Sequence, residues 1–327
     1  MKHAPLIAIL LGLAASAWLI AWVGAGQVAE AVMVAGFPGI AAITLFNVVP
    51  IAACGIAWRA LIEPPPAHGT LLMGWVRFLR STVSGLVPIG GELVAIRVMI
   101  LHGIGGHTAG AATVVDMTLE MVTQLAFTAL GLALLLLDGR DDTLAGWVLA
   151  GLGVAVATAL VFLIAQRRGL FRWAAALPHR MAARVSWARL PELAGIDAEI
   201  SAIYRRPRAL LLGTLWHFIG WIVGAGEAWI ALWFLNAPVS FSEVLILESL
   251  AFALRSTAFL VPAGIGVQEG GYVALGALFG LGPEVGLALS LLKRAREVLL
   301  AVPALLTWKL VELRAWRRRA LATTLAS

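Results

Sequence analysis

Cysteine is almost absent from this sequence: Cys54 is the single one among 327 residues. One cysteine excludes an internal disulfide framework, and it also excludes a metal or iron–sulfur site built from several thiolates. The sequence contains no His-Glu-x-x-His motif, no phosphate-binding loop ending in Gly-Lys-Ser/Thr and no dinucleotide glycine fingerprint. We therefore expect neither a metal site nor a cofactor.

Charged residues are also scarce, at 13% of the chain against 61% hydrophobic residues. A water-soluble domain does not reach this balance, because its surface has to be polar. The formal charge of +6 lies mostly in two short segments beside apolar runs, where it is better explained by membrane topology than by nucleic acid binding. The composition thus predicts an integral membrane protein, and no nucleic-acid partner is expected.

Six apolar runs are long enough to cross the ~30 Å hydrocarbon core of a bilayer. They cover residues 4–24, 37–62, 108–137, 143–165, 209–235 and 284–308. The first run favours a membrane anchor over a cleaved signal peptide, because it continues well beyond a short hydrophobic core. Two further apolar stretches, 71–101 and 243–281, contain charges and are interrupted by proline and glycine, so neither is expected to be a plain spanning helix.

The distribution of lysine and arginine predicts the orientation of the chain. Residues 166–208 contain nine arginines against three acidic residues, and residues 309–319 contain five basic residues. Both segments are expected to be cytoplasmic, which predicts a multi-pass protein of the cytoplasmic membrane with cytoplasmic N- and C-termini. Within the first segment, residues 172–189 resemble an interfacial amphipathic helix attracted to anionic lipid, although a solvated loop is an alternative.

This topology gives the two interrupted stretches a special path. Residues 71–101 have to enter from the cytoplasm and return to it, whereas residues 243–281 have to enter from the opposite side and return there. Both are therefore predicted to be re-entrant helical hairpins. The predicted fold is all-α, with about six transmembrane helices and two re-entrant hairpins arranged as inverted-topology repeats.

An internal repeat is indicated by matches at a nearly constant offset. Leu-Arg-Ser-Thr occurs at 79–82 and 254–257, Leu-Val-Pro occurs at 86–88 and 260–262, Glu92 matches Glu269, and Glu120 matches Glu297. We expect one membrane domain, 1–327, with repeat halves at about 37–137 and 209–309 joined by the basic connection 166–208.

The hairpins are expected to turn at Pro88–Glu92 and at Pro262–Gly271. Proline and glycine interrupt the helical hydrogen bonds, so the freed backbone groups have to be buried in protein or face a wet cavity. Helix N-termini that meet there would attract an anion such as phosphate. A structural kink without a ligand is the alternative.

Charged side chains at membrane depth are the main candidates for a site. Asp116 and Glu120 lie four residues apart in one span, and Lys293 and Glu297 lie four apart in another. A charge at the bilayer centre costs at least ~2.5–3.5 kcal/mol, so these groups have to point inward and find partners. Lys293 and Glu297 can pair with each other. Asp116 and Glu120 are both acidic, so they need another partner. The candidates are Arg80, Arg97, Arg255 and Arg296, or a bound cation or proton.

Arg80 and Arg255 precede the two turns by similar distances, and a guanidinium binds phosphate oxygens in a bidentate manner. Neutralising the nearby glutamates is the alternative role, and a buried ion network without a substrate is the alternative for the whole set. Arg77, Glu227, Glu248 and Arg294 also lie at apparent membrane depth, but their helical phase is open. The candidate substrate-binding residues are Arg80, Pro88, Gly91, Glu92, Arg97, Asp116, Glu120, Arg255, Pro262, Gln268, Glu269, Lys293, Arg296 and Glu297.

These residues form a familiar pattern. Leu86-Val87-Pro88 with Gly91-Glu92 and Arg97, the helix of Asp116 and Glu120, the segment Pro262–Glu269 and the helix of Arg296-Glu297 resemble the flippase-like membrane domain of lysylphosphatidylglycerol synthases. The resemblance covers nearly the whole chain. Within that superfamily, residues 267–296 are similar to stand-alone members associated with hopanoid biosynthesis.

The resemblance implies movement of lipids between leaflets, with substrates that range over aminoacylated phospholipids, polyprenyl-linked sugars and hopanoids. It does not imply aminoacyl transfer, because a separate soluble synthase domain performs that step in the bifunctional members. It supplies no catalytic residues, and it implies that the shared proline, glycine, glutamate and arginine positions line the site.

Three functions are therefore compatible with the sequence. The leading hypothesis is a flippase or scramblase, and not an enzyme, for a lipid or lipid-linked molecule such as a hopanoid or a modified phospholipid. The second is an intramembrane lipid-modifying enzyme with Asp116 or Glu120 as general base. The third is an accessory scaffold of a lipid biosynthesis complex. The expected partners are a membrane lipid substrate and anionic lipids at the cytoplasmic surface, and an oligomer is compatible with the sequence.

Overall fold

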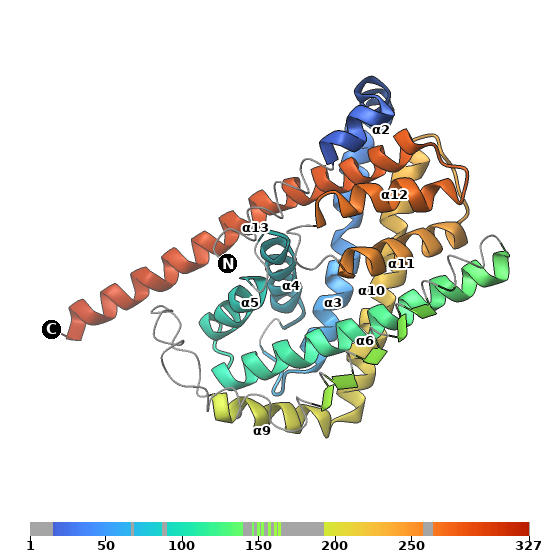
Figure 1. Cartoon of the computed structure of the whole chain (residues 1–327). Coiled ribbons are helices and arrows are strands. Elements are labelled where there is room, and N and C mark those ends of the chain that lie inside the picture. The colour runs from blue at the N-terminus through green and yellow to red at the C-terminus, as the bar shows by residue number, and fades with distance from the viewer. Residues whose placement is uncertain are drawn as a thin grey trace, which may run out of the picture. The chain divides into compact units, whose positions relative to one another are not determined.

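The computed structural model describes residues 16–66, 69–86, 90–139, isolated positions between 146 and 164, 193–257 and 264–326. Regular secondary structure in these residues is helical throughout (Figure 1). The labelled helices are α2 (Ala25–Phe46), α3 (Val48–Ala60), α4 (Gly69–Leu86), α5 (Gly90–Leu101), α6 (Gly106–Asp138), α9 (Leu193–Tyr204), α10 (Pro207–Phe234), α11 (Phe241–Thr257), α12 (Val267–Ala277) and α13 (Pro283–Ala326). The predicted all-α fold is confirmed.

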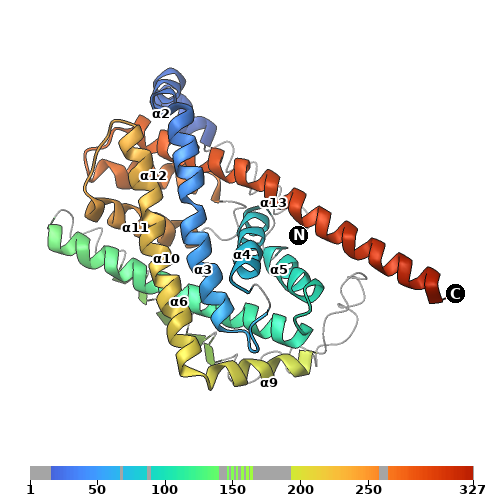
Figure 2. The ribbon, with the colours of Figure 1, turned by 180° about the vertical axis from the view of Figure 1, so that it is seen from behind.

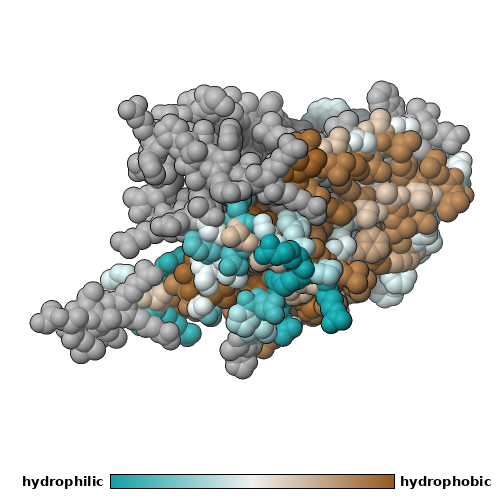
Figure 3. Space-filling view, turned by 90° about the horizontal axis from the view of Figure 1, so that it is seen from below, coloured by the Kyte–Doolittle hydropathy of each residue, from teal (hydrophilic) through white to brown (hydrophobic). Residues whose placement is uncertain are grey.

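Three stretches of helix in the described residues have the length and apolar composition of a membrane span. They cover Ala25–Ala60, Gly106–Asp138 and Pro207–Phe234, and they contain most of the predicted spans 37–62, 108–137 and 209–235. Large apolar side chains such as Phe37, Leu71 and Leu137 are highly exposed. Figure 3 shows a broad apolar surface on one face of the described residues. Such a surface is suited to contact with lipid and not with water.

The remaining predicted spans differ in outcome. Most of span 4–24, much of span 143–165 and the whole segment 172–189 lie outside the described residues. Span 284–308 is part of α13, a helix of 44 residues. At 1.5 Å per residue, α13 is about 66 Å long, roughly twice the hydrocarbon thickness.

The helix α2 begins at Ala25, so the acidic residue Glu30 lies within a helix. A kink interrupts α2 at Gly36, which has φ 54° and ψ −164° and precedes Pro38. Glycine adopts such a positive φ without a steric penalty, and proline removes the hydrogen-bond donor that would continue the helix.

The chain divides into two compact units. Unit 1 contains residues 1–53, 120–160 and 214–298, and unit 2 contains residues 54–119, 161–213 and 299–327. Unit 2 therefore combines α4 and α5 with the first part of α6 and the last part of α13. Unit 1 combines α11 and α12 with the first part of α13 and the last part of α6. A repeat would give this reciprocal composition, although the repeat itself stays a prediction.

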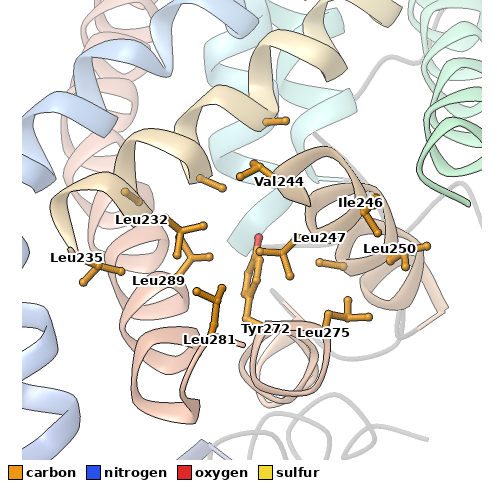
Figure 4. Close-up of a cluster of buried hydrophobic side chains, with 14 of the residues drawn as sticks. Leu232, Leu235, Val244, Ile246, Leu247, Leu250, Tyr272, Leu275, Leu281 and Leu289 are labelled. Carbon is orange, nitrogen blue, oxygen red and sulfur yellow. The ribbon is translucent and has the colours of Figure 1, made fainter. Parts of the chain in front are cut away.

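Each unit has its own apolar core. In unit 1, side chains of α10, α11, α12 and α13 surround the ring of Tyr272 (Figure 4). In unit 2, Trp58, Met73, Leu79 and Met99 are fully buried. The backbones of α3 and α4 also approach closely, since a Cβ added to Gly55 would lie 2.6 Å from the Cα of Gly74.

The two predicted hairpins are pairs of packed helices, α4 with α5 and α11 with α12 (Figures 1 and 2). The predicted extent of their turns was wrong at one end. Gly91 and Glu92 are in the first turn of α5, and residues 268–271 are in α12. Pro88 and Pro262 lie outside the described residues.

Both helices begin earlier than predicted, and each has a carboxylate at its third position. Oε2 of Glu269 accepts a hydrogen bond from the backbone N–H of Gly266 at 2.7 Å, which satisfies a donor at the N-terminus of α12. Glu92 has the same position in α5. A negative charge there also interacts favourably with the helix dipole.

Candidate functional site

The charged groups of unit 2 converge on Asp116, which is completely buried on α6. The NH1 group of Arg80, from α4, donates to Oδ2 of Asp116 at 2.9 Å, and NH1 of Arg77 lies 3.7 Å from the same oxygen. Nε of Arg80 also donates to Oε1 of Glu92, on α5, at 3.2 Å. We call Arg77, Arg80, Glu92 and Asp116 the Asp116 cluster. It confirms that Arg80 is a partner for Asp116.

Close packing of α4 and α5 brings this cluster together. A Cβ added to Gly91 would lie 2.2 Å from the carbonyl oxygen of Arg80 and 2.1 Å from Oγ of Ser84, so only glycine fits. Ser84 in turn lies within 3.4 Å of both carboxylate oxygens of Glu92. The guanidinium of Arg80 is 5.4 Å from the ring centroid of Trp58, a cation–π distance.

Arg97, a predicted site residue, binds elsewhere. Its Nε and NH2 groups donate to the two carboxylate oxygens of Glu312, on α13, at 3.0 and 3.1 Å. Both side chains are about one-third exposed, at 33% and 34%. Glu120 follows Asp116 by one turn of α6 and is half-buried.

Unit 1 contains a closed triangle of hydrogen bonds that we call the Lys293 triangle. Nζ of Lys293 donates to Oε2 of Glu248 at 2.6 Å and lies 2.9 Å from the hydroxyl of Tyr272. That hydroxyl donates to Oε1 of Glu248 at 2.7 Å. All three residues are buried. The ammonium group also faces the ring of Phe252, with 5.9 Å to its centroid.

The expected pairing of Lys293 with Glu297 is therefore wrong. The order of lysine before glutamate at four-residue spacing is the weaker one on a helix. Lysine at position 293 instead finds Glu248 on α11, within the packed interior. Glu248 and Tyr272 were outside the predicted site.

A second group of unit 1 surrounds Glu297 and is called the arginine cluster. Its members Arg255, Arg294 and Arg296 lie 3.7, 3.8 and 3.7 Å from carboxylate oxygens of Glu297. Arg255 comes from α11, and the other three residues come from α13. The side chains of Arg255 and Glu297 are 31% and 33% exposed, so this cluster is partly exposed, whereas the Lys293 triangle is buried.

Two buried glutamates support the arginine cluster. Oε1 of Glu269 accepts a hydrogen bond from Nε of Arg294 at 2.8 Å. Oε1 of Glu227, on α10, lies 3.1 Å from Nε of Arg296 and forms an ion pair with it, without hydrogen-bond geometry. Nδ2 of Asn47 donates to Glu227 at 2.8 Å. Gln268 links the cluster to α13, because its amide accepts from Arg255 at 3.1 Å and donates to Ser290 at 3.0 Å.

The family model of the lysylphosphatidylglycerol synthase TM region matches residues 9–323. The chain belongs to this family. No curated protein and no solved structure matches the chain significantly.

Membership in the lysylphosphatidylglycerol synthase TM family confirms the resemblance inferred from the hairpin motifs, whereas the hopanoid subgroup stays a prediction. The match covers both units, so the Asp116 cluster and the arginine cluster are parts of the family's membrane region. It supports a membrane function that involves lipid. No group of three or more His, Cys, Asp or Glu side chains in the described residues is arranged to hold a metal ion.

The structure thus distributes the predicted residues over both units. Arg80, Gly91, Glu92 and Asp116 meet in unit 2, and Arg255, Gln268, Glu269, Arg296 and Glu297 meet in unit 1. The sequence placed Arg77, Glu227, Glu248 and Arg294 within apolar stretches, but it did not predict which way their side chains point. Asn47, Ser290 and Tyr272 carry no charge and gave no signal.

Proposed function

We propose that this protein moves a lipid or lipid-linked molecule between the leaflets of the cytoplasmic membrane, as a flippase or scramblase. The observation that supports this best is the arginine cluster. It brings Arg255, from the last turn of α11, beside charged residues of α13 that lie in the apolar run 284–308. The side chains of Arg255 and Glu297 are partly exposed, at 31% and 33%. Charges exposed at membrane depth are costly against hydrocarbon, so they are suited to a wet opening that can receive a polar headgroup.

The two helix pairs support the same proposal. Each pair has a glutamate at the third position of its second helix, and each glutamate binds an arginine, Arg80 for Glu92 and Arg294 for Glu269. Broken helices with charged groups near their ends are typical of secondary transporters. Re-entrant insertion of both pairs is part of the proposal.

Chemistry at Asp116 is less well supported. A general base has to reach its substrate and accept a proton. Asp116 is fully buried and binds Arg80 at 2.9 Å, so its carboxylate is shielded from a substrate. We therefore propose transport and not catalysis.

Reconstitution in liposomes tests the proposal. A fluorescent phospholipid is quenched from outside with a membrane-impermeant reductant, and an active protein makes the whole lipid pool accessible and not only the outer leaflet. Arg255→Gln is expected to slow this exchange because it removes an exposed charge of the arginine cluster. Arg206→Gln is the matched control, since Arg206 is 28% exposed and pairs with Glu63 at 2.8 Å.

Absence of exchange with a range of headgroups, or equal rates for Arg255→Gln and the unmodified protein, would contradict the proposal. Lipid mass spectrometry of a deletion strain separates transport from catalysis. Loss of a chemical species indicates an enzyme, whereas unchanged species in the wrong leaflet indicate a transporter.

A further inference from the structure

Glu297 has an unusual set of contacts. Three guanidinium groups surround it at 3.7–3.8 Å, yet among the described residues it forms no hydrogen bond with any of them. A guanidinium bound to a carboxylate normally approaches to about 2.7–2.9 Å. Arg97 and Glu312 approach each other more closely than the three arginines approach Glu297, at 3.0 and 3.1 Å, and form two hydrogen bonds. Glu297 therefore balances the charge of its neighbours without using their donors.

Arg255 has the most exposed side chain of the three arginines, at 31% against 21% for Arg294 and 13% for Arg296. A guanidinium has five N–H donors. Within the described residues, Arg255 uses one of them, toward Gln268 at 3.1 Å, and its side chain is 31% exposed. Gly264, with φ +60°, makes room for it, since an added Cβ would lie 3.0 Å from Cγ of Arg255.

The predicted repeat provides a contrast. Arg80, the counterpart of Arg255, is 9% exposed and binds both Glu92 and Asp116. Glu92 and Asp116 hold Arg80 from α5 and α6, so its charge is neutralised inside unit 2. The two related arginines thus have different roles, and the open one is in unit 1.

We propose that Glu297 occupies the position of an anionic phosphate group, and that a phosphate-bearing lipid headgroup displaces it to bind Arg255 together with Arg294 and Arg296. This inference rests on the proposed transport function and names the chemistry of its substrate. Phosphate oxygens match the donors of several guanidinium groups. Arg294 and Arg296 stay neutralised by Glu269 and Glu227, so the headgroup replaces only the charge of Glu297.

Binding to the purified full-length protein in an uncharged detergent tests this inference. The probes are water-soluble dihexanoyl phosphatidylglycerol, neutral dihexanoylglycerol and inorganic phosphate. We expect saturable binding of the first, with much weaker binding of the other two. Equal binding of inorganic phosphate would identify a site for the free ion and overturn the lipid assignment. Equal binding of the neutral lipid would overturn the role of the phosphate.

Glu297→Gln is the decisive variant, because it removes the competing charge and keeps the side-chain size. Its affinity for dihexanoyl phosphatidylglycerol is expected to rise about tenfold, whereas Arg255→Gln is expected to lower it by a similar factor. Glu312→Gln is the matched control, with 34% exposure and an arginine partner, and its affinity is expected to stay unchanged. Unchanged or weaker binding by Glu297→Gln would overturn the inference.

A second variant guards against misfolding. Glu297→Asp withdraws the carboxylate by one methylene and is also expected to bind more tightly than the unmodified protein, so no gain with either variant contradicts the inference. The lipid-exchange assay keeps the two proposals separable. If the protein exchanges lipid but its affinity for the lipid probe does not depend on Glu297, only the inference is overturned. If the protein neither exchanges lipid nor binds the probe, both proposals are overturned.

Discussion

The Lys293 triangle consists of three polar groups that satisfy one another in a buried site. Lysine supplies donors, Glu248 accepts two hydrogen bonds at 2.6 and 2.7 Å, and the hydroxyl of Tyr272 links them. Removing one member leaves a buried group without its partner, which costs more than the pair itself contributes.

Lys293→Met and Glu248→Gln are therefore expected to lower the free energy of unfolding by about 3–5 kcal/mol each. The double variant should lose clearly less than the sum, because no charge is left unpaired. Unfolding in detergent, followed by the thermal midpoint, measures both effects.

Arg97→Gln is the reference for an exposed pair, with an expected cost of about 0–1 kcal/mol. Additive losses in the Lys293→Met/Glu248→Gln double variant would show that the two residues act independently, against the triangle.

At the same scale, the sequence named Arg80 among the candidate partners of Asp116, but it did not predict the partners of Lys293 and Arg97. Four-residue spacing placed Lys293 and Glu297 on one helix face, yet the partner of Lys293 is 45 residues away in the chain. Arg97 shows the same difficulty, because Glu312 is 215 residues away. Distant partners depend on the packing of helices, and spacing along one helix does not contain that information.

Among the structural elements, the contact between α4 and α5 depends on one missing side chain. Gly91 lies against the backbone of α4, where the carbonyl of Arg80 cannot move without unwinding the helix. This contact also sets the position of Glu92 beside Arg80.

Gly91→Ala is expected to force α4 and α5 apart and to lower the thermal midpoint by several degrees, since overpacking typically costs about 1–3 kcal/mol. Gly85→Ala, on the same helix pair, is the control because an added Cβ meets no atom within 4 Å. Alanine is a better helix former than glycine, so this variant should be neutral or up to ~1 kcal/mol more stable. Equal midpoints for the two variants would contradict the packing.

The sequence predicted most helices of the described residues but placed some ends wrongly. Pro88, Gly90 and Gly91 were expected to extend the first turn to Glu92, whereas α5 begins at Gly90. Glu92 at its third position binds Arg80, a contact with α4 that spacing along the chain does not reveal. The end of α13 was also placed wrongly, because the predicted span stopped at residue 308. Hydropathy falls after residue 308, but the helix continues to Ala326 with an exposed Leu310, Leu313 and Trp316. A fall in hydropathy marks a change in the surroundings of a helix, and it does not mark the residue at which the helix ends.

For the whole molecule, the inverted topology can be tested from the water-filled sides of the membrane. Four exposed positions lie at the ends of the two helix pairs: Pro65 and Gly105 for α4 and α5, and Pro238 and Pro283 for α11 and α12. A single native cysteine, Cys54, can be replaced by alanine to give a background free of thiols.

Pro65→Cys and Gly105→Cys are expected to react with a membrane-impermeant maleimide only from the cytoplasmic side, and Pro238→Cys and Pro283→Cys only from the opposite side. The reason is that a re-entrant pair returns to the side from which it entered. Labelling of intact cells and of inverted vesicles measures the accessible side. Opposite sides within either pair would show that its helices cross the bilayer completely.

At this scale the family and the all-α membrane class followed from the sequence, because composition and the Pro-Gly-Glu motifs of the hairpins determine both. The division of α6 at Glu120 and of α13 at Leu299 between two units did not. A continuous helix has no sequence break where its surroundings change, so no pattern marks these positions.

The closed triangle of Lys293, Glu248 and Tyr272 also constrains how this protein can evolve. Each single substitution leaves a buried charge or hydrogen-bond donor without its partner. Replacing the three residues by aliphatic ones, one at a time, therefore passes through less stable variants. We therefore expect the three positions to vary together, so that a relative that lacks the lysine also lacks the glutamate and the hydroxyl.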